Sequence, residues 1–185
     1  MTSSQNKKSG FIKTYHEIPP IRQHAEFCQR NPQECRLANG NGRMKLTKIR
    51  WRQLVSINKW VNKNIIYTPE KGDVWGYPKR VYYYHRGKFR FKYKGDCEEY
   101  VILKRHKLIK KGWPASSLLI TVVWDENGEG HAVLTARTAQ GDYVLDNKSS
   151  KVKKWNKVPY KFRKMQSHRN PRQWVSLRPR LKVGM

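Results

Sequence analysis

Cysteine, histidine and aspartate occur in this chain in an order that suits nucleophilic catalysis. Cys97 lies in the run Gly-Asp-Cys-Glu-Glu, His131 follows Gly-Glu-Gly, and Asp146 ends a run of apolar residues. A cysteine nucleophile needs a base to take its proton, and the base needs a carboxylate to fix its tautomer. The three residues therefore predict a thiol active site, with Cys97 as nucleophile, His131 as base and Asp146 as orienting carboxylate.

Local signals place Cys97 in the first turn of a helix. Asp96 suits the N-cap position, Glu99 completes an acidic capping box, and Gly112 with Pro114 closes the far end. A helix N-terminus stabilises a thiolate, and its free N–H groups also suit the oxyanion of a tetrahedral intermediate. From position alone, a lone cysteine in a first turn is usually a buried packing residue.

His131 and Asp146 fall on strands that follow this helix. Buried or half-buried strands are predicted over Leu118–Trp124, His131–Thr138 and Tyr143–Asp146. The order of one helix and three strands predicts an α+β fold, in which the nucleophile helix packs on an antiparallel sheet.

The hairpin register decides whether His131 and Asp146 meet. A loop centred between Thr138 and Ala139 would place them opposite each other. A two-residue Gln140-Gly141 turn would instead leave them roughly 13 Å apart along the strands. Both registers keep the two side chains on one face. An exposed strand-end histidine and a turn aspartate are the alternative interpretations.

A second helix is predicted from Leu46 to about Asn64, with Thr47 as its N-cap. Its apolar residues recur at helical spacing. They are Ile49, Trp51, Leu54, Ile57, Trp60, Val61 and Ile65.

The charge balance is strongly basic. Lys and Arg number 40 against 13 Asp and Glu, which gives a formal net charge of +27, and no acidic residue follows Asp146. A field of this sign attracts polyanions such as nucleic acid, anionic lipid or acidic proteins. We expect a flexible lead over residues 1–20, one domain over 21–165, and a basic arm over 166–185 that could meet nucleic acid or another polyanion.

A second acid-free stretch, from Val74 to Gly95, mixes basic and aromatic residues around a hairpin at His85–Lys88. Such a mixture could bind single-stranded nucleic acid through charge and stacking. The alternative is a β-rich segment whose aromatic residues lie in the core and whose charges face water, and the alternation of residue types favours this second interpretation.

Cys28 and Cys35 lie close together in FCQRNPQECR. They could close a small disulfide loop, which would imply an oxidising compartment, or remain two free thiols in a reducing one. The opening residues contain no apolar signal-peptide core, and no run is long enough to span a membrane. The expected location is periplasmic or extracellular if the chain is exported, and otherwise a virion or the cytoplasm.

The segments KGDCEEYVILKRHKLIKKGWP and GEGHAVLTARTAQGDYVLDN resemble the bacterial transglutaminase-like cysteine peptidases, whose pattern includes GDCEDYA, G-W-P, HAVL and VLDN. Weaker similarity covers FCQRNPQECR, which resembles the family's paired-cysteine loop. The resemblance implies a papain-like or transglutaminase-like core and a hydrolase, a thiol protease with Cys97, His131 and Asp146 as its catalytic residues. It also implies a protein substrate, cleaved at a peptide or isopeptide bond through a Cys97 thioester.

The resemblance also implies calcium as a cofactor. Family members that release surface adhesins are calcium-dependent periplasmic proteases that bind the ion through carboxylates beside the cysteine. Here those are Asp96 and Glu98, with Glu99 where many members have Asp. Three carboxylates this close to a thiolate oppose its ionisation unless a cation is present. Capping by Asp96 and Glu99, with Glu98 facing water, is the alternative.

Two departures from the family leave other functions open. The basic and aromatic stretch before Gly95 replaces the family's short Asp-Tyr-Trp link, near where substrate should enter. The basic arm would suit a structural or nucleic-acid-associated protein of phage or virion type that retains the fold and meets an assembly partner. Within enzymes, a protein-crosslinking transglutaminase, in which an amine replaces water, is the alternative to hydrolysis.

Overall fold

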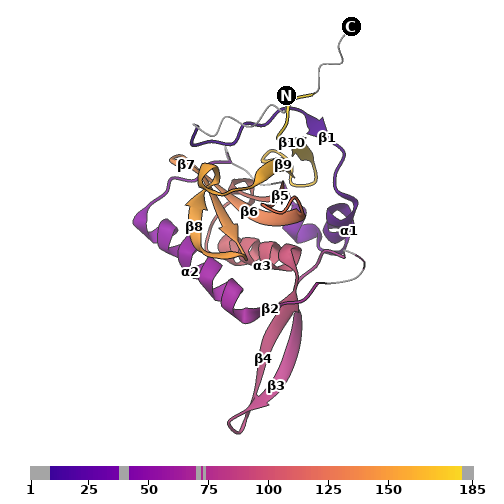
Figure 1. Ribbon diagram of the computed structural model, residues 1–185, viewed down its shortest axis with the longest axis vertical. Helices are drawn as coiled ribbons and strands as arrows, with labels where there is room; N and C mark the ends of the chain where they lie inside the picture. Colours follow the sequence, from indigo (N-terminus) through magenta and orange to yellow (C-terminus); the bar gives the residue numbers. More distant parts are fainter. Residues whose placement is uncertain (1–8, 38–41, 70–71, 73, 181–185) are drawn as a thin grey trace.

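The computed structural model describes residues 9–37, 42–69, 72 and 74–180. Figure 1 shows a body of helices and a twisted sheet, with one long hairpin extending from it. In chain order the elements are β1 (Glu17–Ile18), α1 (Arg22–Arg30), η1 (Pro32–Cys35), α2 (Lys48–Asn64), β2 (Ile65–Tyr67), β3 (Lys79–His85), β4 (Lys88–Gly95), α3 (Cys97–Lys110), η2 (Ala115–Ser117), β5 (Leu118–Trp124), β6 (Gly130–Thr138), β7 (Gly141–Asp146), β8 (Ser149–Lys154), η3 (Trp155–Lys157), β9 (Lys161–Gln166) and β10 (Trp174–Ser176).

The body is built on a seven-stranded antiparallel sheet, ordered β1-β10-β9-β5-β6-β7-β8. Helices α2 and α3 contribute to one core cluster together with β5 and β6. The predicted α+β fold, with the Cys97 helix packed on an antiparallel sheet, is therefore confirmed.

Strand β5 is buried on both faces because the sheet has a core cluster on each side. Leu118 and Ile120 belong to the cluster shared with the helices, whereas Leu119 and Val123 belong to a second cluster that contains Trp155. Successive strand side chains point to opposite faces. A continuous apolar run is thus what a strand in this central position requires.

Helix α2 begins after Thr47, whose hydroxyl accepts a hydrogen bond from the Arg50 N–H, as predicted for its N-cap. Its core residues include Leu54, Ile57 and Val61. Two members of the predicted apolar set differ: Ile49 and Trp60 are exposed, because only one face of α2 meets the body.

Each predicted extension contains a strand of the sheet. Ile12 is buried, and β1 pairs with β10 through Glu17 opposite Val175. The boundaries expected at residues 20 and 166 would leave β1 and β10 outside the domain, whereas these two strands complete one edge of its sheet. Strand pairing between distant segments leaves no local sequence signal. Residues 1–8 and 181–185 lie outside the described part.

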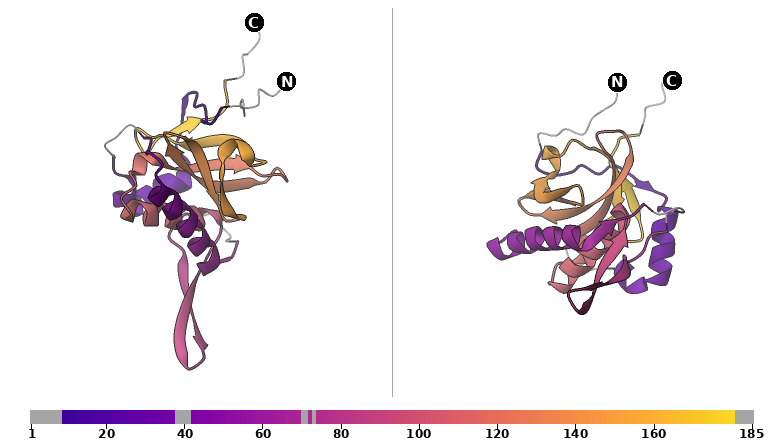
Figure 2. Two further views of the ribbon diagram at one scale, coloured as in Figure 1. Left: turned by 90° about the vertical axis from the view of Figure 1, so that its left-hand side faces the viewer. Right: turned by 60° about the horizontal axis from the view of Figure 1, so that its bottom comes forward.

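The β3–β4 hairpin extends away from the body in two views (Figures 1 and 2). It turns at Arg86 and Gly87, which have φ values of 48° and 73°, as tight hairpin turns require. Every residue of β3 is exposed. The hairpin is confirmed where it was predicted, but the interpretation of its aromatic residues as core is wrong, because no layer covers this ribbon within the described residues.

Cys28 and Cys35 form a disulfide that joins α1 to η1, with a Cα–Cα distance of 5.6 Å. This resolves the choice left open by the sequence. Among the described helices, none has the length and apolarity needed to cross a membrane.

Candidate active site

Helix α3 begins at Cys97, directly after the N-cap Asp96. The predicted capping box is present: the Asp96 side chain accepts from the backbone of Glu99, and the Glu99 carboxylate accepts from the Asp96 N–H at 2.9 Å. A Cβ on Gly95 would lie 2.6 Å from the Glu99 Cβ. Only glycine at residue 95 therefore lets Glu99 fold back over the start of the helix.

The Cys97 residue is half-buried, at the first turn of α3. It donates a hydrogen bond to Glu98 Oε2 at 3.1 Å. Burial, followed by the Glu98 charge, raises the pKa of Cys97, whereas the Ala132 backbone N–H acts in the opposite direction. Ala132 directly follows His131, so Cys97 contacts the strand β6 at the residue next to the predicted base.

His131 and Asp146 form a buried pair. His131 Nε2 lies 2.8 Å from Asp146 Oδ1, and both side chains are about 4% exposed. Because a carboxylate only accepts, Nε2 carries the proton and Nδ1 is left as the basic nitrogen. Asp146 also accepts from the Tyr160 hydroxyl and from the Lys148 N–H. Burial alone would raise the pKa of Asp146, but these donors outweigh it and the pKa is lowered.

The observed register lies between the two that the sequence suggested. Thr138 pairs with Gly141, so Ala139 and Gln140 form a two-residue turn. Leu134 pairs with Leu145, which brings Asp146 to the level of Val133, two residues from His131. Diagonal neighbours on one face of an antiparallel pair are close enough for long side chains to meet.

The carboxylates beside the thiol are crowded. Ligand atoms of Asp96, Cys97 and Glu98 all lie within 4.8 Å of one another. Burial, followed by interaction with Asp96, raises the pKa of both Glu98 and Glu99 to about 8. Glu99, the third residue predicted to bind calcium, is outside this group of ligand atoms because one of its oxygens caps the helix.

Three residues near Asp146 escaped sequence reasoning. Tyr160 donates to its carboxylate, and the Asn62 side chain donates to its backbone carbonyl at 2.8 Å. Lys104 is fully buried in α3, and among the described residues nothing accepts a hydrogen bond from its ammonium group. Burial lowers the pKa of Lys104 to about 7, although the Asp146 charge opposes this. The sequence signal for Lys104 was a lysine next to apolar residues in the middle of a predicted helix.

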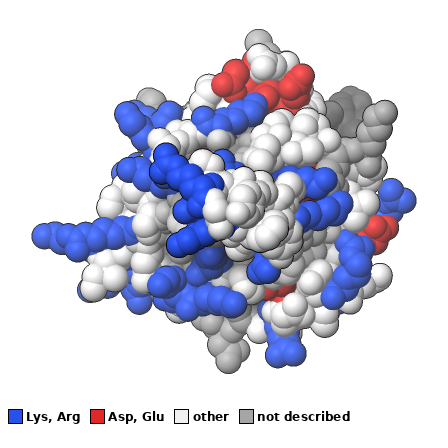
Figure 3. Space-filling model, turned by 90° about the horizontal axis from the view of Figure 1, so that it is seen from below, with Lys and Arg blue, Asp and Glu red and all other residues white. Residues whose placement is uncertain are grey.

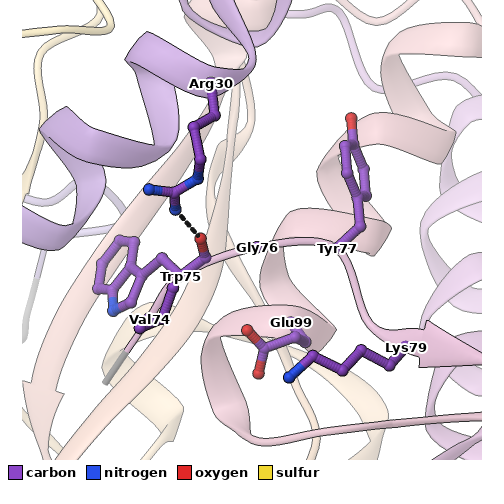
Figure 4. A pocket seen from close by; sticks show the side chains of 7 residues that line it. All are labelled: Arg30, Val74, Trp75, Gly76, Tyr77, Lys79 and Glu99. Atoms are coloured by element: carbon purple, nitrogen blue, oxygen red, sulfur yellow. Dashed lines mark hydrogen bonds between the residues drawn. The ribbon is translucent and has the colours of Figure 1, made fainter. Parts of the chain in front are cut away.

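A small pocket lies behind the start of α3, between Glu99 and the segment that leads into β3. In Figure 4 the ammonium end of Lys79 points toward the Glu99 carboxylate, and Arg30 donates to the Trp75 carbonyl at 2.8 Å. This pocket separates the capping box from the base of the hairpin.

The chain matches the family model of the bacterial transglutaminase-like cysteine proteinases (BTLCP) over residues 14–182. It therefore belongs to this family, which places it among the cysteine peptidases. A comparison with curated proteins finds no match.

The solved structures that resemble the chain include three of LapG from Legionella pneumophila. The calcium-bound form is 22% identical, with 87% of this chain and 93% of that chain covered and a TM-score of 0.53. The EGTA-treated form is 23% identical over 80% and 83% of the two chains, with a TM-score of 0.49. Another LapG structure is 24% identical, and the match spans 65% of each chain with a TM-score of 0.49. The likeness to calcium-bound LapG shows a shared fold.

Proposed function

We propose that this chain hydrolyses peptide bonds through a thioester at Cys97, with His131 as base and Asp146 as orienting carboxylate. The observation that carries the proposal is the buried 2.8 Å pair between His131 Nε2 and Asp146 Oδ1. That pair leaves His131 Nδ1 basic, and the adjacent Ala132 N–H interacts with the Cys97 sulfur. The His131–Asp146 pair and the contact of Cys97 with the residue next to His131 support the nucleophile, base and orienting group that family membership leads one to expect.

Each proton has a place to go in this reaction. His131 takes the thiol proton, the sulfur attacks the carbonyl carbon, and N–H groups at the start of α3 hold the oxyanion. The C–N bond then breaks as His131 returns the proton to the leaving amine. Water, deprotonated by His131, attacks the thioester, the C–S bond breaks, and the protonated imidazole restores the thiol.

Calcium fits the carboxylates beside the nucleophile. Asp96 and Glu98 offer oxygen ligands within 4.8 Å of one another, and Ca²⁺ prefers carboxylate oxygens. Burial and the neighbouring Asp96 raise the pKa of Glu98, which supports a bound cation here. Bound calcium would supply positive charge beside the thiol, and LapG, with which the chain shares its fold, has a calcium-bound structure.

Alkylation of Cys97 by iodoacetamide as a function of pH tests the site. With calcium bound, the wild type should react at lower pH than an ordinary thiol, whose pKa is about 8.5, and His131→Ala should remove that advantage. Calcium should accelerate the reaction relative to chelator. Glu98→Gln should weaken the calcium effect, while Glu17→Gln, an exposed acid of the edge strand β1, should retain it.

Ordinary thiol reactivity, unchanged in His131→Ala with calcium present, would contradict the proposed nucleophile. Product analysis then separates the enzyme classes. Cleavage of a protein substrate to new termini supports hydrolysis, whereas incorporation of an added amine would assign transglutaminase chemistry instead. Because the Cys28–Cys35 disulfide persists in oxidising surroundings, we also propose a periplasmic or extracellular location.

A further inference from the structure

The β3–β4 hairpin has two faces of different chemistry. Residues opposite each other across the pair lie on one face, as do alternate residues along each strand. Tyr82 faces Phe91 and Tyr84 faces Phe89, which makes one face aromatic. The other face is mostly basic. It carries Lys79, Val81, Tyr83, His85, Lys88, Arg90, Lys92 and Lys94.

The aromatic rings form a row that continues onto the body. Ring centroids lie 5.2 Å apart for Tyr84 and Phe89, 6.0 Å for Tyr82 and Phe91, and 5.4 Å for Phe91 and Tyr93. Tyr93 in turn meets Trp60 of α2, at 6.4 Å. These rings remain accessible, since Phe89 is 82% exposed and Tyr84 is 65% exposed. An apolar surface of this extent on a projecting element is typical of a binding site.

The base of the hairpin is held in place. The Tyr77 hydroxyl, two residues before β3, donates to the buried Glu34 carboxylate, which also lies 2.7 Å from His106 Nδ1. Trp75 is buried and packs on Trp174. The segment that leads into the hairpin is therefore anchored to the body, which suits docking better than a loose connection would.

One edge of the ribbon is available for pairing. In the described structure, β3 is the end strand of the β2-β4-β3 sheet and pairs only with β4. An edge strand offers a row of backbone groups to which an extended peptide can add. A peptide added there would direct alternate side chains to the aromatic face and to the basic face.

We infer that the hairpin captures an acidic, extended polypeptide by strand addition to β3, with apolar and acidic residues alternating along its sequence. No acidic residue occurs from Val74 to Gly95. Figure 3 is seen from below, where the hairpin projects, and shows Lys and Arg spread over this face of the molecule. The inference rests on the proposed function: β4 ends at Gly95, two residues before Cys97, so the base of the hairpin leads directly to the nucleophile.

A polypeptide accounts for more of these features than a nucleic acid does. Stacked bases need free ring faces, and Arg80 already lies over the face of Phe91 at 4.9 Å. An open strand edge has no use in base stacking. The two-sided chemistry of the ribbon matches the alternation of side chains in a strand.

Binding to the full-length Cys97→Ser protein can be measured by the fluorescence anisotropy of labelled peptides that have the same length as β3. The probes are an alternating Asp/Leu peptide, a block peptide of the same composition, and the alternating peptide with N-methylated amides. The alternating peptide should bind roughly tenfold more tightly than the other two. Tyr84→Ser/Phe89→Ser and Arg90→Glu/Lys92→Glu should each weaken it by a similar factor, while Lys157→Glu/Lys161→Glu, with the same change in charge, should not.

Equal affinity for the block and alternating peptides would overturn strand addition. Tighter binding of single-stranded DNA or anionic vesicles than of the alternating peptide would overturn the choice of partner. Iodoacetamide labelling of Cys97 in the hairpin variants keeps the two proposals separate. A hairpin variant that loses peptide binding but is labelled at the wild-type rate has an intact catalytic site. A His131→Ala variant that loses labelling but binds the peptide normally is changed at the catalytic site alone.

Discussion

The Asp146 carboxylate is the most heavily hydrogen-bonded side chain of the candidate site. Its donors come from three separate parts of the chain: the imidazole of His131, the hydroxyl of Tyr160 and the backbone of Lys148. A buried carboxylate with several donors stays ionised despite desolvation. Asp146 can therefore hold His131 in one tautomer without competing for its proton.

Tyr160→Phe should destabilise the protein by about 1–2 kcal/mol at neutral pH, because a buried charge loses a hydrogen bond. The folded-state pKa of Asp146 lies below its ordinary value, so its stabilising contribution is present above that ordinary value and is lost as the pH falls through the folded-state pKa. The difference between variant and wild type in urea unfolding should accordingly shrink on acidification. Tyr143→Phe is the control, and a pH-independent difference would argue against the Asp146 contact.

Lys104 should give a second pH dependence of stability, which comes from a buried cation and not from a buried carboxylate. Burial lowers its pKa from 10.5 to about 7, so between these values the unfolded chain binds more protons and stability should rise with pH. Lys104→Met should be more stable than wild type at pH 7, by on the order of 2 kcal/mol, and the gain should fade toward pH 10. Lys110→Met, at the exposed end of α3, should show no such trend. A destabilised Lys104→Met variant at pH 7 would mean that the ammonium group is paired.

At the scale of elements, the first turn of α3 combines a structural cap with the nucleophile. Glu99 satisfies the Asp96 N–H, and the Gly95 backbone makes room for it. The N–H groups beyond the cap are then free for the oxyanion and the thiolate. Disturbing the cap should affect both the stability of the helix and the reactivity of Cys97.

Gly95→Ala should lower the free energy of unfolding by about 1–2 kcal/mol, because its Cβ would lie 2.6 Å from the Glu99 Cβ and displace the cap. Gly76→Ala is a matched control, since a Cβ there meets nothing within 4 Å. Urea unfolding measures both variants, and iodoacetamide labelling reports on Cys97. Equal stabilities of the two variants would show that Glu99 moves aside at no cost.

At the scale of the whole molecule, the disulfide loop connects the helices to the hairpin. Glu34, next to Cys35, contacts Tyr77 at the base of the hairpin and Arg105 in α3. Arg105 also donates to the carbonyl of Leu118, the first residue of β5. One buried carboxylate therefore joins the loop, the nucleophile helix and the projecting arm.

Removing the disulfide with Cys28→Ser/Cys35→Ser should cost about 2 kcal/mol, the value expected for a short closed loop. Thermal unfolding with and without reductant measures the effect: reductant should lower the wild-type Tm and leave the variant unchanged. If the unfolded, unreduced wild type reacts with three equivalents of a thiol reagent, the disulfide is absent in solution.

Local signals sufficed for the elements that carry the chemistry. The Asp96–Glu99 capping box, the Thr47 cap and the turn at Arg86-Gly87 all depend on residues within a few positions of one another, so the sequence contains them directly. The α+β order of elements followed from the same signals. Family resemblance added the roles of Cys97, His131 and Asp146, which the geometry alone would have left as one arrangement among several.

Tertiary structure decided what depends on distant partners. Strand β1 joins the sheet only because β10, from the other end of the chain, pairs with it, and Tyr160 reaches Asp146 through the return of the chain into β9. The alternation of residue types in β3 and β4 would be the same in a half-buried strand and in an exposed ribbon. The exposure of their side chains therefore depends on whether another layer covers the two strands. Pairing and burial are properties of two surfaces in contact, and a sequence pattern describes one surface at a time.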